Sequence, residues 1–476
     1  MKVIRNYFYN MSYQLLVLIA PLITVPYVAR VIGPVGAGIN AYTNSIVAYF
    51  YLVGSLGITL YGNREIAFHR DNLEERSRIF WEVELLQIIT IFAAYLAFLV
   101  FLHFDHHYRL FFLMQSLSLI AGAIDISWYF MGLEDFKKTT LRNSVVRIIT
   151  IIMIFTFIHK PSDLWLYIMI LSASSLVGNA MLWPYLPKLV KKVPLSSLHI
   201  WRHVGPSFIL FIPTISMQLY IMVNKTMLKA MVSVQAAGYM DYSDKFINMA
   251  MVAVTSLSVV LLPHIANLFA NNKLEAVHRS LYRSFQFVTA LAIPLMFGMS
   301  AIAPKFIVWF LSPKFTTTGI LLIIQTPIIL LIAWNNTIGR QYLLPVKRVR
   351  DYTLSVSIGA GVNVIANYIC IKLFGVYGAA IATVITEVFV TGYQIIVVRK
   401  NLDLKQMFHD LWKFFVAGGF MGIIVWQVAS RLPSHLISFL VEIALGAIIY
   451  VVVALLLKAD IFLEALGYLK HKPKKN

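Results

Sequence analysis

The stretch SHLISFLVEIALGAIIYVVVALLL occupies residues 434–457 and contains one charged side chain, that of Glu442. A helix needs about 20 consecutive apolar residues to cross the hydrocarbon core of a bilayer. The stretch therefore predicts a transmembrane helix, and similar stretches recur from near residue 12 onward. A transmembrane barrel would instead show segments of roughly 10 residues with alternating polarity, a pattern that this sequence lacks.

The composition agrees with a chain surrounded mainly by lipid. Apolar residues make up 59% of the 476 residues and charged residues 13%, against roughly 45–50% and 25% in soluble domains. Mean hydropathy is +0.76. The single cysteine, Cys370, excludes a disulfide framework or a thiolate metal site within one chain. The sequence therefore predicts an all-α integral membrane protein.

Breaks in hydropathy, marked by charges, proline and glycine, divide the chain into about fourteen predicted spans. The first is too long for the apolar region of a signal peptide and lacks a small-residue cleavage site, so we expect it to stay in the protein. The predicted spans are 12–31, 40–61, 79–102, 109–131, 143–159, 164–187, 204–230, 241–268, 284–311, 319–342, 353–374, 376–398, 411–430 and 434–457.

Lysine and arginine collect in the even-numbered gaps between these spans and in the C-terminal tail. Positive loops are retained in the cytoplasm during insertion, so both termini are predicted to be cytoplasmic and the chain to lie in the cell membrane. This asymmetry, with contact to anionic lipid headgroups, explains most of the net charge of +19. Nucleic-acid binding is not needed to account for the charge.

A short internal repeat appears at an offset of 200 residues. GPVGAGINAY at 33–42 then faces SVQAAGYMDY at 233–242, and both join an odd-numbered span to an even-numbered one. This pairing predicts two six-helix lobes related by a pseudo-two-fold axis along the membrane normal, which is typical of transporters. We expect an N-lobe over 1–203 (helices 1–6), a C-lobe over 204–400 (helices 7–12), and helices 13–14 with a basic cytoplasmic tail over 401–476.

Motifs of enzymes and nucleotide-driven pumps are absent from the sequence. It has no phosphate-binding loop ending in Gly-Lys-Ser/Thr, no Gly-x-Ser-x-Gly and no His-Glu-x-x-His. The cluster His103-Phe104-Asp105-His106-His107 is the nearest approach to a metal site, but adjacent histidines do not easily face one ion and polar residues are expected at the interface. We therefore expect neither catalysis nor a bound metal.

Positive side chains inside or at the ends of predicted spans are the candidates for a substrate site. Ionisable residues there cost roughly 2.5–3.5 kcal/mol each on insertion, and usually face a wet cavity or a partner. Lys225 and Lys229 share one helix face. Arg30 follows two prolines, which favour a bent helix that lines a cavity. The candidate residues are Arg30, Arg64, Lys225, Lys229 and Lys245.

Four of the candidates also have a simpler explanation. Arg30 and Lys229 could reach the outer interface with their long side chains. Arg64 could follow the positive-inside pattern alone. Lys245 could pair with Asp241, four residues earlier on the same helix.

Two groups of motifs resemble a known family. VARVIGPVGAG at 28–38, then Gly57 and YGNREIA at 61–67, resembles the amino-terminal signature of polysaccharide-biosynthesis flippases. These are the O-antigen and capsule repeat-unit transporters of the multidrug/oligosaccharidyl-lipid/polysaccharide superfamily. NKTML at 224–228, followed by Gly238-Tyr239 and Lys245, resembles the start of the second half in that family.

The resemblance implies a function and its partners. Two six-helix lobes would alternate access to a cationic cavity, and thereby move an undecaprenyl-type diphosphate oligosaccharide from the inner to the outer leaflet. Helices 13 and 14 would form a groove for the lipid tail, as in the related lipid II flippase. Membrane lipids, a polysaccharide polymerase and glycosyltransferases are the expected neighbours. Independently, a diphosphate requires clustered lysine or arginine.

The resemblance also suggests an ion-coupling site, for Na⁺ or H⁺, in place of any cofactor. Asn363 and Asn367 are one turn apart in one predicted span, and Thr383 and Glu387 in the next; with Asn224 they could surround a small cation with oxygens. Related lipid flippases have carboxylates at some of these positions, which are mostly neutral here. Asparagine that packs helices together is the alternative.

Two other functions remain open at this point. A multidrug exporter of the same superfamily would have a cavity rich in carboxylates, which the cationic bias of spans 1, 7 and 8 disfavours. A membrane polymerase or glycosyltransferase would depend on a nucleotide sugar or carry long outer loops with acidic residues.

Overall fold

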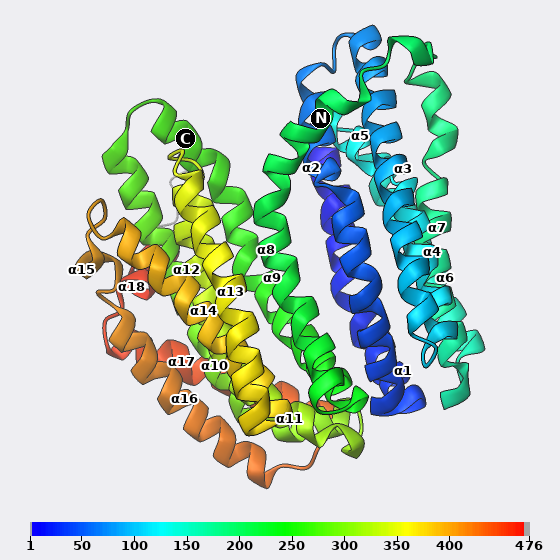
Figure 1. Cartoon of the computed structure of the whole chain (residues 1–476). Coiled ribbons are helices and arrows are strands. Elements are labelled where there is room, and N and C mark those ends of the chain that lie inside the picture. The colour runs from blue at the N-terminus through cyan, green and yellow to red at the C-terminus, as the bar shows by residue number, and fades with distance from the viewer. Residues whose placement is uncertain (1, 471–476) are drawn as a thin grey trace. The chain divides into compact units, whose positions relative to one another are not determined.

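The computed structural model describes residues 2–470, and their side chains outside 2–15, 17–18, 212–214, 216–217, 256–264, 465 and 468–470. The regular elements in this part of the chain are helices (Figure 1). The lysines at 472, 474 and 475 of the predicted basic tail lie outside the described residues.

The chain divides into two compact units, Met1–Gly238 and Tyr239–Asn476. The boundary falls within α9 (Val234–Ala270). The helix at Val204–Met231, which the sequence analysis assigned to the C-lobe, therefore belongs to the first compact unit. The two lobes were predicted from the internal repeat and not from compactness, so the compact units do not test them. The lobes stay a prediction.

The first unit begins with a long helix that is kinked at Gly33, whose φ of 65° is readily adopted only by glycine. The prolines at 21, 26 and 34 lie inside the same helix. The helices of this unit are α1 (Lys2–Ser55), α2 (Ile58–Phe68), α3 (Leu73–Phe104), α4 (Arg109–Ala123), α5 (Ser127–Gly132), α6 (Phe136–Phe157), η1 (Pro161–Asp163), α7 (Leu164–Ala180), η2 (Trp183–Lys188), η3 (Leu195–Ser197), η4 (Ile200–His203) and α8 (Val204–Met231).

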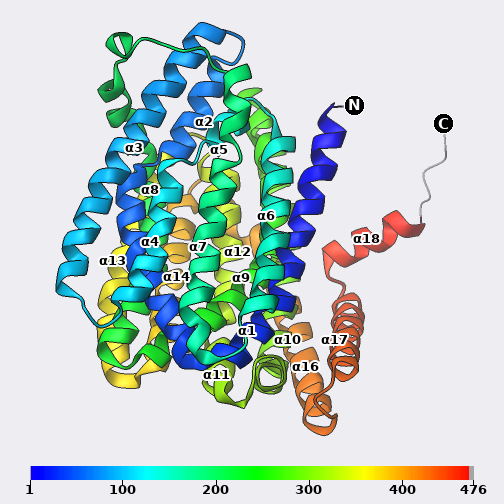
Figure 2. The same cartoon turned by 90° about the vertical axis from the view of Figure 1, so that its right-hand side faces the viewer.

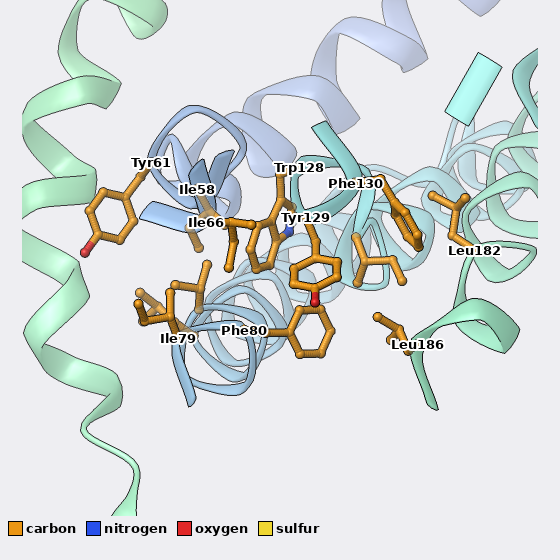
Figure 3. Close-up of a cluster of buried hydrophobic side chains, with 13 residues drawn as sticks. Ile58, Tyr61, Ile66, Ile79, Phe80, Trp128, Tyr129, Phe130, Leu182 and Leu186 are labelled. Atoms are coloured by element: carbon orange, nitrogen blue, oxygen red, sulfur yellow. The ribbon is translucent and has the colours of Figure 1, made fainter. Parts of the chain in front are cut away.

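An aromatic cluster forms one core of the first unit (Figure 3). The rings of Phe80 and Trp128 stack with centroids 5.7 Å apart, and Tyr129 meets Phe80 edge-on at 5.0 Å. A Cβ atom on Gly62 would lie 2.5 Å from the Trp128 ring, so only glycine allows α2 to pack this closely. The cluster holds α2, α3 and α5 together.

The two segments of the internal repeat contact each other within the first unit. A Cβ atom on Gly38 would lie 1.8 Å from the backbone oxygen of Val234, and one on Gly238 would lie 2.5 Å from that of Pro34. Backbone therefore packs directly on backbone, and no side chain fits between them. The repeat identified in the sequence thus marks a pair of closely packed glycines.

The second unit is built around α10 (Leu274–Phe310), which packs against α11, α12, α16 and α17. Its amphipathic last helix, α18 (Asp460–Lys470), follows α17 (Figure 2). The other elements are η5 (Pro313–Phe315), α11 (Thr316–Gln325), α12 (Pro327–Asn335), the π-helix η6 (Asn336–Leu343), α13 (Val349–Phe374), α14 (Val376–Val398), α15 (Leu404–Met407), α16 (Leu411–Arg431) and α17 (Leu436–Leu456).

The described residues contain ten helical stretches that are long and apolar enough to cross a membrane, or up to eleven if a pair bent by 45°, Pro313–Gln325 and Pro327–Leu343, forms one span. The sequence analysis predicted about fourteen. The stretch Ile19–Phe68 counts as one, although it contains most of the first predicted span and all of the second. The predicted spans 204–230 and 241–268 fall on α8 and α9, whose side chains are described only in part.

Candidate functional site

Three of the predicted cationic residues lie on α1 and α8. Arg30 is exposed on α1, three residues before the kink at Gly33. Lys225 and Lys229 are partly buried, one turn apart on α8. The hydroxyl groups of Tyr49 on α1 and Thr226 on α8 lie 3.2 Å apart, so Lys225 flanks the contact between these two helices.

Lys229 lies against two aromatic rings. Its Nζ is 4.6 Å from the ring centroid of Tyr42 and 5.6 Å from that of Tyr108. Burial, together with the charge of Asp105, raises the pKa of Tyr108 and keeps its phenol neutral. Cation–π contacts of this kind stabilise by about 0.5–2 kcal/mol. Lys229 therefore joins α8 to α1 and to the start of α4, and its contact with substrate stays a prediction.

Arg64 lies on α2 with its side chain 46% exposed. Its Nη2 is 3.4 Å from Glu65 Oε1, and its guanidinium carbon is 5.8 Å from the ring centroid of Tyr61. Half of the side chain is thus available to a ligand, and Tyr61 connects Arg64 to a buried polar network.

This network centres on Glu82 of α3, whose side chain is fully buried. The backbone N–H of His199 donates to Glu82 Oε1 at 2.7 Å. Arg202 donates to Glu82 Oε2 through Nε at 3.0 Å and Nη2 at 2.6 Å. His203 Nε2 lies 2.7 Å from the same oxygen. The carboxylate therefore fixes the segment before α8 onto α3.

His203 completes the network on its other side. Its Nδ1 is 2.6 Å from the hydroxyl oxygen of Tyr61. A neutral ring that is protonated at Nε2 can donate to Glu82 and accept from the Tyr61 hydroxyl, which satisfies every group. Burial lowers the pKa of His203 and outweighs the opposing effect of Glu82. Arg202 then supplies the positive charge that balances Glu82.

Glu82, Arg202 and His203 were not among the predicted site residues. Glu82 and His203 are separated by 121 residues, so no local motif joins them. A signal was nevertheless present, because Glu82 and Glu84 are charged residues inside the predicted span 79–102 and neither was among the candidates.

Lys245, in the second unit, pairs with its own helix. Its Nζ lies 2.8 Å from Asp241 Oδ2, in the i, i+4 arrangement, and 4.6 Å from the centroid of the Tyr242 ring. Asp244 accepts from Gln325 Nε2 at 2.9 Å. The alternative explanation for Lys245, an intrahelical ion pair, is therefore present in the structure, while its side chain remains 38% exposed.

Four of the five predicted ion-coupling residues lie on the neighbouring helices α13 and α14. Asn363, Asn367, Thr383 and Glu387 are all buried. Asn363 Nδ2 donates to Thr386 Oγ1 at 3.1 Å, and Asn367 Nδ2 donates to Asn363 Oδ1 at 2.9 Å. Amide, hydroxyl and carboxylate oxygens are the ligands that small hard cations prefer. Asn224, the fifth residue, is buried in the first unit.

One other cluster has the composition of a metal site. Among the described residues, His409, Asp410 and Asp460 form the group of three whose ligand atoms lie within 4.8 Å of one another. Lys413 Nζ already lies 2.6 Å from Asp410 Oδ1, and Asp410 Oδ2 accepts from the backbone N–H of Asp460 at 2.7 Å. These contacts explain the cluster as a clamp between α16 and α18.

The second unit also contains an apolar groove of about 450 Å³ between α10, α16 and α17. Leu291, Met299, Val425 and Ala447 are among its lining residues. Glu442 also lines it, fully buried and 4.0 Å from Lys305. Helices α16 and α17 correspond to the predicted helices 13 and 14, so a groove is present on the helices where the resemblance implied one.

Comparison with known proteins identifies the family. Residues 3–269 match the polysaccharide biosynthesis protein family. A relative in Escherichia coli (strain K12), named "Putative O-antigen transporter", is 25% identical over 83% of this chain and 97% of its own length. "Probable flippase AglR" of Haloferax volcanii is 23% identical over 56% of this chain and 55% of its own length.

Solved structures show the fold. The lipid II flippase MurJ in an inward closed conformation superposes with a TM-score of 0.76 at 18% identity, over 96% of this chain and 99% of that one. An inward-facing multidrug resistance MATE family transporter of the MOP superfamily superposes with a TM-score of 0.61 at 10% identity, over 87% and 99%. At these identities the likeness establishes the fold alone.

The family match covers more than half of the chain and confirms the family that the motifs at 28–38 and 61–67 indicated. This multi-pass all-α membrane chain, with the fold of MurJ and MATE transporters, therefore belongs to the polysaccharide biosynthesis protein family.

Proposed function

We propose that the chain is a flippase that moves polyprenyl-diphosphate-linked oligosaccharide from the inner to the outer leaflet of the cytoplasmic membrane. The observation that carries this proposal is the family match over residues 3–269. A relative named as an O-antigen transporter aligns over nearly its whole length, and the MurJ flippase has the same fold. Family and relatives agree with the expectation of a transporter rather than an enzyme.

The finer architecture is part of the proposal. The chain would cross the membrane fourteen times, with both termini in the cytoplasm and lobes at 1–203 and 204–400. Support for the count comes from the kink at Gly33, which divides the long stretch Ile19–Phe68, and from α8 and α9, which contain 28 and 37 residues. The asymmetry of lysine and arginine supports the orientation.

The diphosphate would bind cationic side chains in the cavity. Arg30 is exposed and Arg64 and Lys245 are partly exposed, whereas Lys229 is engaged by aromatic rings. An arginine can hold a phosphate through two parallel N–H donors. Arg30 is therefore a strong candidate for this role, and we expect Lys225, partly buried on α8, to share it.

The polyprenyl tail would lie in the apolar groove between α10, α16 and α17. A volume of about 450 Å³ with almost wholly apolar walls suits a hydrocarbon chain. The coupling ion, Na⁺ or H⁺, would use the oxygens of Asn363, Asn367, Thr383 and Glu387. Glycosyltransferases would supply the lipid-linked sugar, and a polymerase would consume it.

Export in cells tests this proposal. In a strain that lacks its own repeat-unit flippase, Arg30→Ala and Lys225→Ala should abolish or severely reduce surface polysaccharide at normal membrane abundance, because each removes a charge-assisted hydrogen bond worth about 1.5–3 kcal/mol. Arg30→Lys should restore export only in part. Lys372→Ala is a matched control, because Lys372 is exposed and contacts the neighbouring Tyr368. Normal polymer from the Arg30→Ala, Lys225→Ala double variant would contradict the cavity assignment.

A further inference from the structure

The fourth predicted span, 109–131, is broken in the structure. Helix α4 ends at Ala123 and α5 begins at Ser127, within a stretch that is long and apolar enough to cross the membrane. A break at membrane depth frees backbone carbonyls, which must find partners because lipid offers none. Broken spans therefore line cavities or bind ligands more often than intact ones do.

Side chains from three other elements bond to carbonyls at the break. Gln87 of α3 donates to the carbonyl of Gly122 at 2.6 Å and to that of Asp125 at 3.2 Å. Asn179 of α7 donates to Ala121 at 2.7 Å, and Trp183 of η2 donates to Ile124 at 2.9 Å. The break is therefore stabilised by side-chain donors. Water can replace these donors if the helices separate.

Glu84 lies one turn before Gln87, so it is on the same face of α3 and points to the break. Its side chain is fully buried. Within the described residues, neither of its carboxyl oxygens has a hydrogen-bond partner. A buried carboxylate without donors is strongly disfavoured in its ionised form. Burial without donors therefore favours the neutral acid while the break is in this conformation.

In the described part of the chain, no positive charge acts on Glu84. The charged group that acts on it is Asp125, a second carboxyl, at the break itself. The ring of Tyr51, from α1, packs against Gly122. Arg142, from α6, donates to Asn179 Oδ1 at 2.6 Å at the edge of the site.

The cationic groups on η4 and α2, which also pack against α3, have partners elsewhere. Arg202 and His203 of η4 bond to Glu82, and Arg64 of α2 lies 3.4 Å from Glu65. Among the described residues, these cations are therefore engaged away from Glu84, and the charge that acts on Glu84 is that of Asp125.

We propose that Glu84 is a proton-binding site of the first unit, protonated while the α4–α5 break is closed and deprotonated when the break admits water. The proton is taken from water and returned to water, and only the O–H bond of the carboxyl forms and breaks. The site is distinct from the predicted ion site on α13 and α14. Its coupling to transport rests on the flippase function proposed above, whereas proton binding itself does not.

Infrared difference spectroscopy of the full chain in lipid nanodiscs tests the binding step. The carbonyl stretch of a protonated, non-hydrogen-bonded carboxylic acid should be present at neutral pH and disappear as the pH is raised. Glu84→Gln should lose this band, and Glu84→Asp should retain a shifted one. Glu75→Gln is the matched control on the same helix and should leave the band unchanged, because Glu75 is 34% exposed and its Oε1 lies 2.8 Å from Arg78 Nη2. A spectrum of Glu84→Gln identical to that of the wild type, or loss of the band on adding Na⁺ at constant pH, would overturn the proposal.

Transport in proteoliposomes tests the coupling. If one proton moves per cycle, a gradient of one pH unit should change the distribution of substrate about tenfold in the wild type. Glu84→Gln should distribute substrate equally with and without the gradient. A full response in Glu84→Gln would overturn the coupling. If the wild type moves no lipid-linked oligosaccharide at all, the flippase function fails while the infrared result still decides the proton site.

Discussion

Replacement of Glu82 by alanine should destabilise the first unit strongly. The fully buried carboxylate accepts from the backbone N–H of His199, from two nitrogens of Arg202, and from His203. Removing one member of a buried ion pair typically costs about 3–5 kcal/mol, because its partners stay buried without it. Arg202 is 40% exposed and regains water, so the loss should lie at the lower end of this range.

Two further variants separate charge from hydrogen bonding. Glu82→Gln keeps one acceptor oxygen, but its NH₂ group faces the N–H donors that the second oxygen accepted. We therefore expect the free energy of unfolding to fall by about 1.5–3 kcal/mol. Glu75→Gln is the matched control on the same helix, since Glu75 pairs with Arg78 at 2.8 Å but is 34% exposed. Its effect should stay below about 1 kcal/mol.

The differences in the free energy of unfolding can be measured by denaturant titration of the purified variants in mild detergent. Tryptophan fluorescence reports the unfolding. The free energy of unfolding from the same titration should depend on pH. Because burial holds the pKa of His203 below its ordinary value of about 6.5, its contribution to the free energy of unfolding is complete above that value and is lost as the pH falls below it. Equal midpoints for Glu82→Ala and Glu75→Gln would refute the view that this network holds η4 on α3.

Two other predictions address packing and topology. Gly38→Ala should lower the free energy of unfolding by about 3 kcal/mol, because its Cβ would lie 1.8 Å from the backbone oxygen of Val234. Gly361→Ala is the control in the same unfolding titration. A Cβ there has no neighbour within 4 Å, so the free energy of unfolding should not change. A wild-type midpoint for Gly38→Ala would contradict the close approach. In a Cys370→Ser background, an impermeant thiol reagent added outside intact cells should label cysteine introduced at Asp105 but not at Lys191. The reverse labelling would contradict the proposed orientation.

Hydrophobic length was the most reliable information in the sequence. The predicted span 376–398 coincides with α14, and the span 434–457 differs from α17 by a residue or two at each end. Both are intact helices, in which about 20 apolar residues determine the structure without help from neighbours.

Breaks and bends were harder to predict because they depend on partners far along the chain. The span 109–131 has continuous hydropathy, yet it breaks at residues 124–126, where Gln87, Asn179 and Trp183 take up the freed carbonyls. In α1 the kink lies at Gly33, after the prolines on which the prediction of a bend rested. Proline at 21 or 26 signals a lost hydrogen bond, but the positive φ occurs where a glycine permits it.

The residues of the candidate site also differ in whether their partners are near or far along the chain. Residue type and spacing were enough to place Asn363 and Asn367 next to α14, because adjacent spans pack side by side. The ion-coupling site itself stays a prediction. The partners of Lys229 and Glu82 come from segments more than a hundred residues away, and only the fold brings them into contact.

The central claim is passive or ion-driven movement of a lipid-linked oligosaccharide without nucleotide hydrolysis. The decisive measurement uses the purified full chain in liposomes, with a fluorescent polyprenyl-diphosphate oligosaccharide whose exposure at the outer leaflet is read by an impermeant quencher. We predict movement between leaflets well above that in protein-free liposomes, with no ATP present. Movement that occurs only when ATP is supplied, or a rate equal to that of protein-free liposomes, would contradict the account.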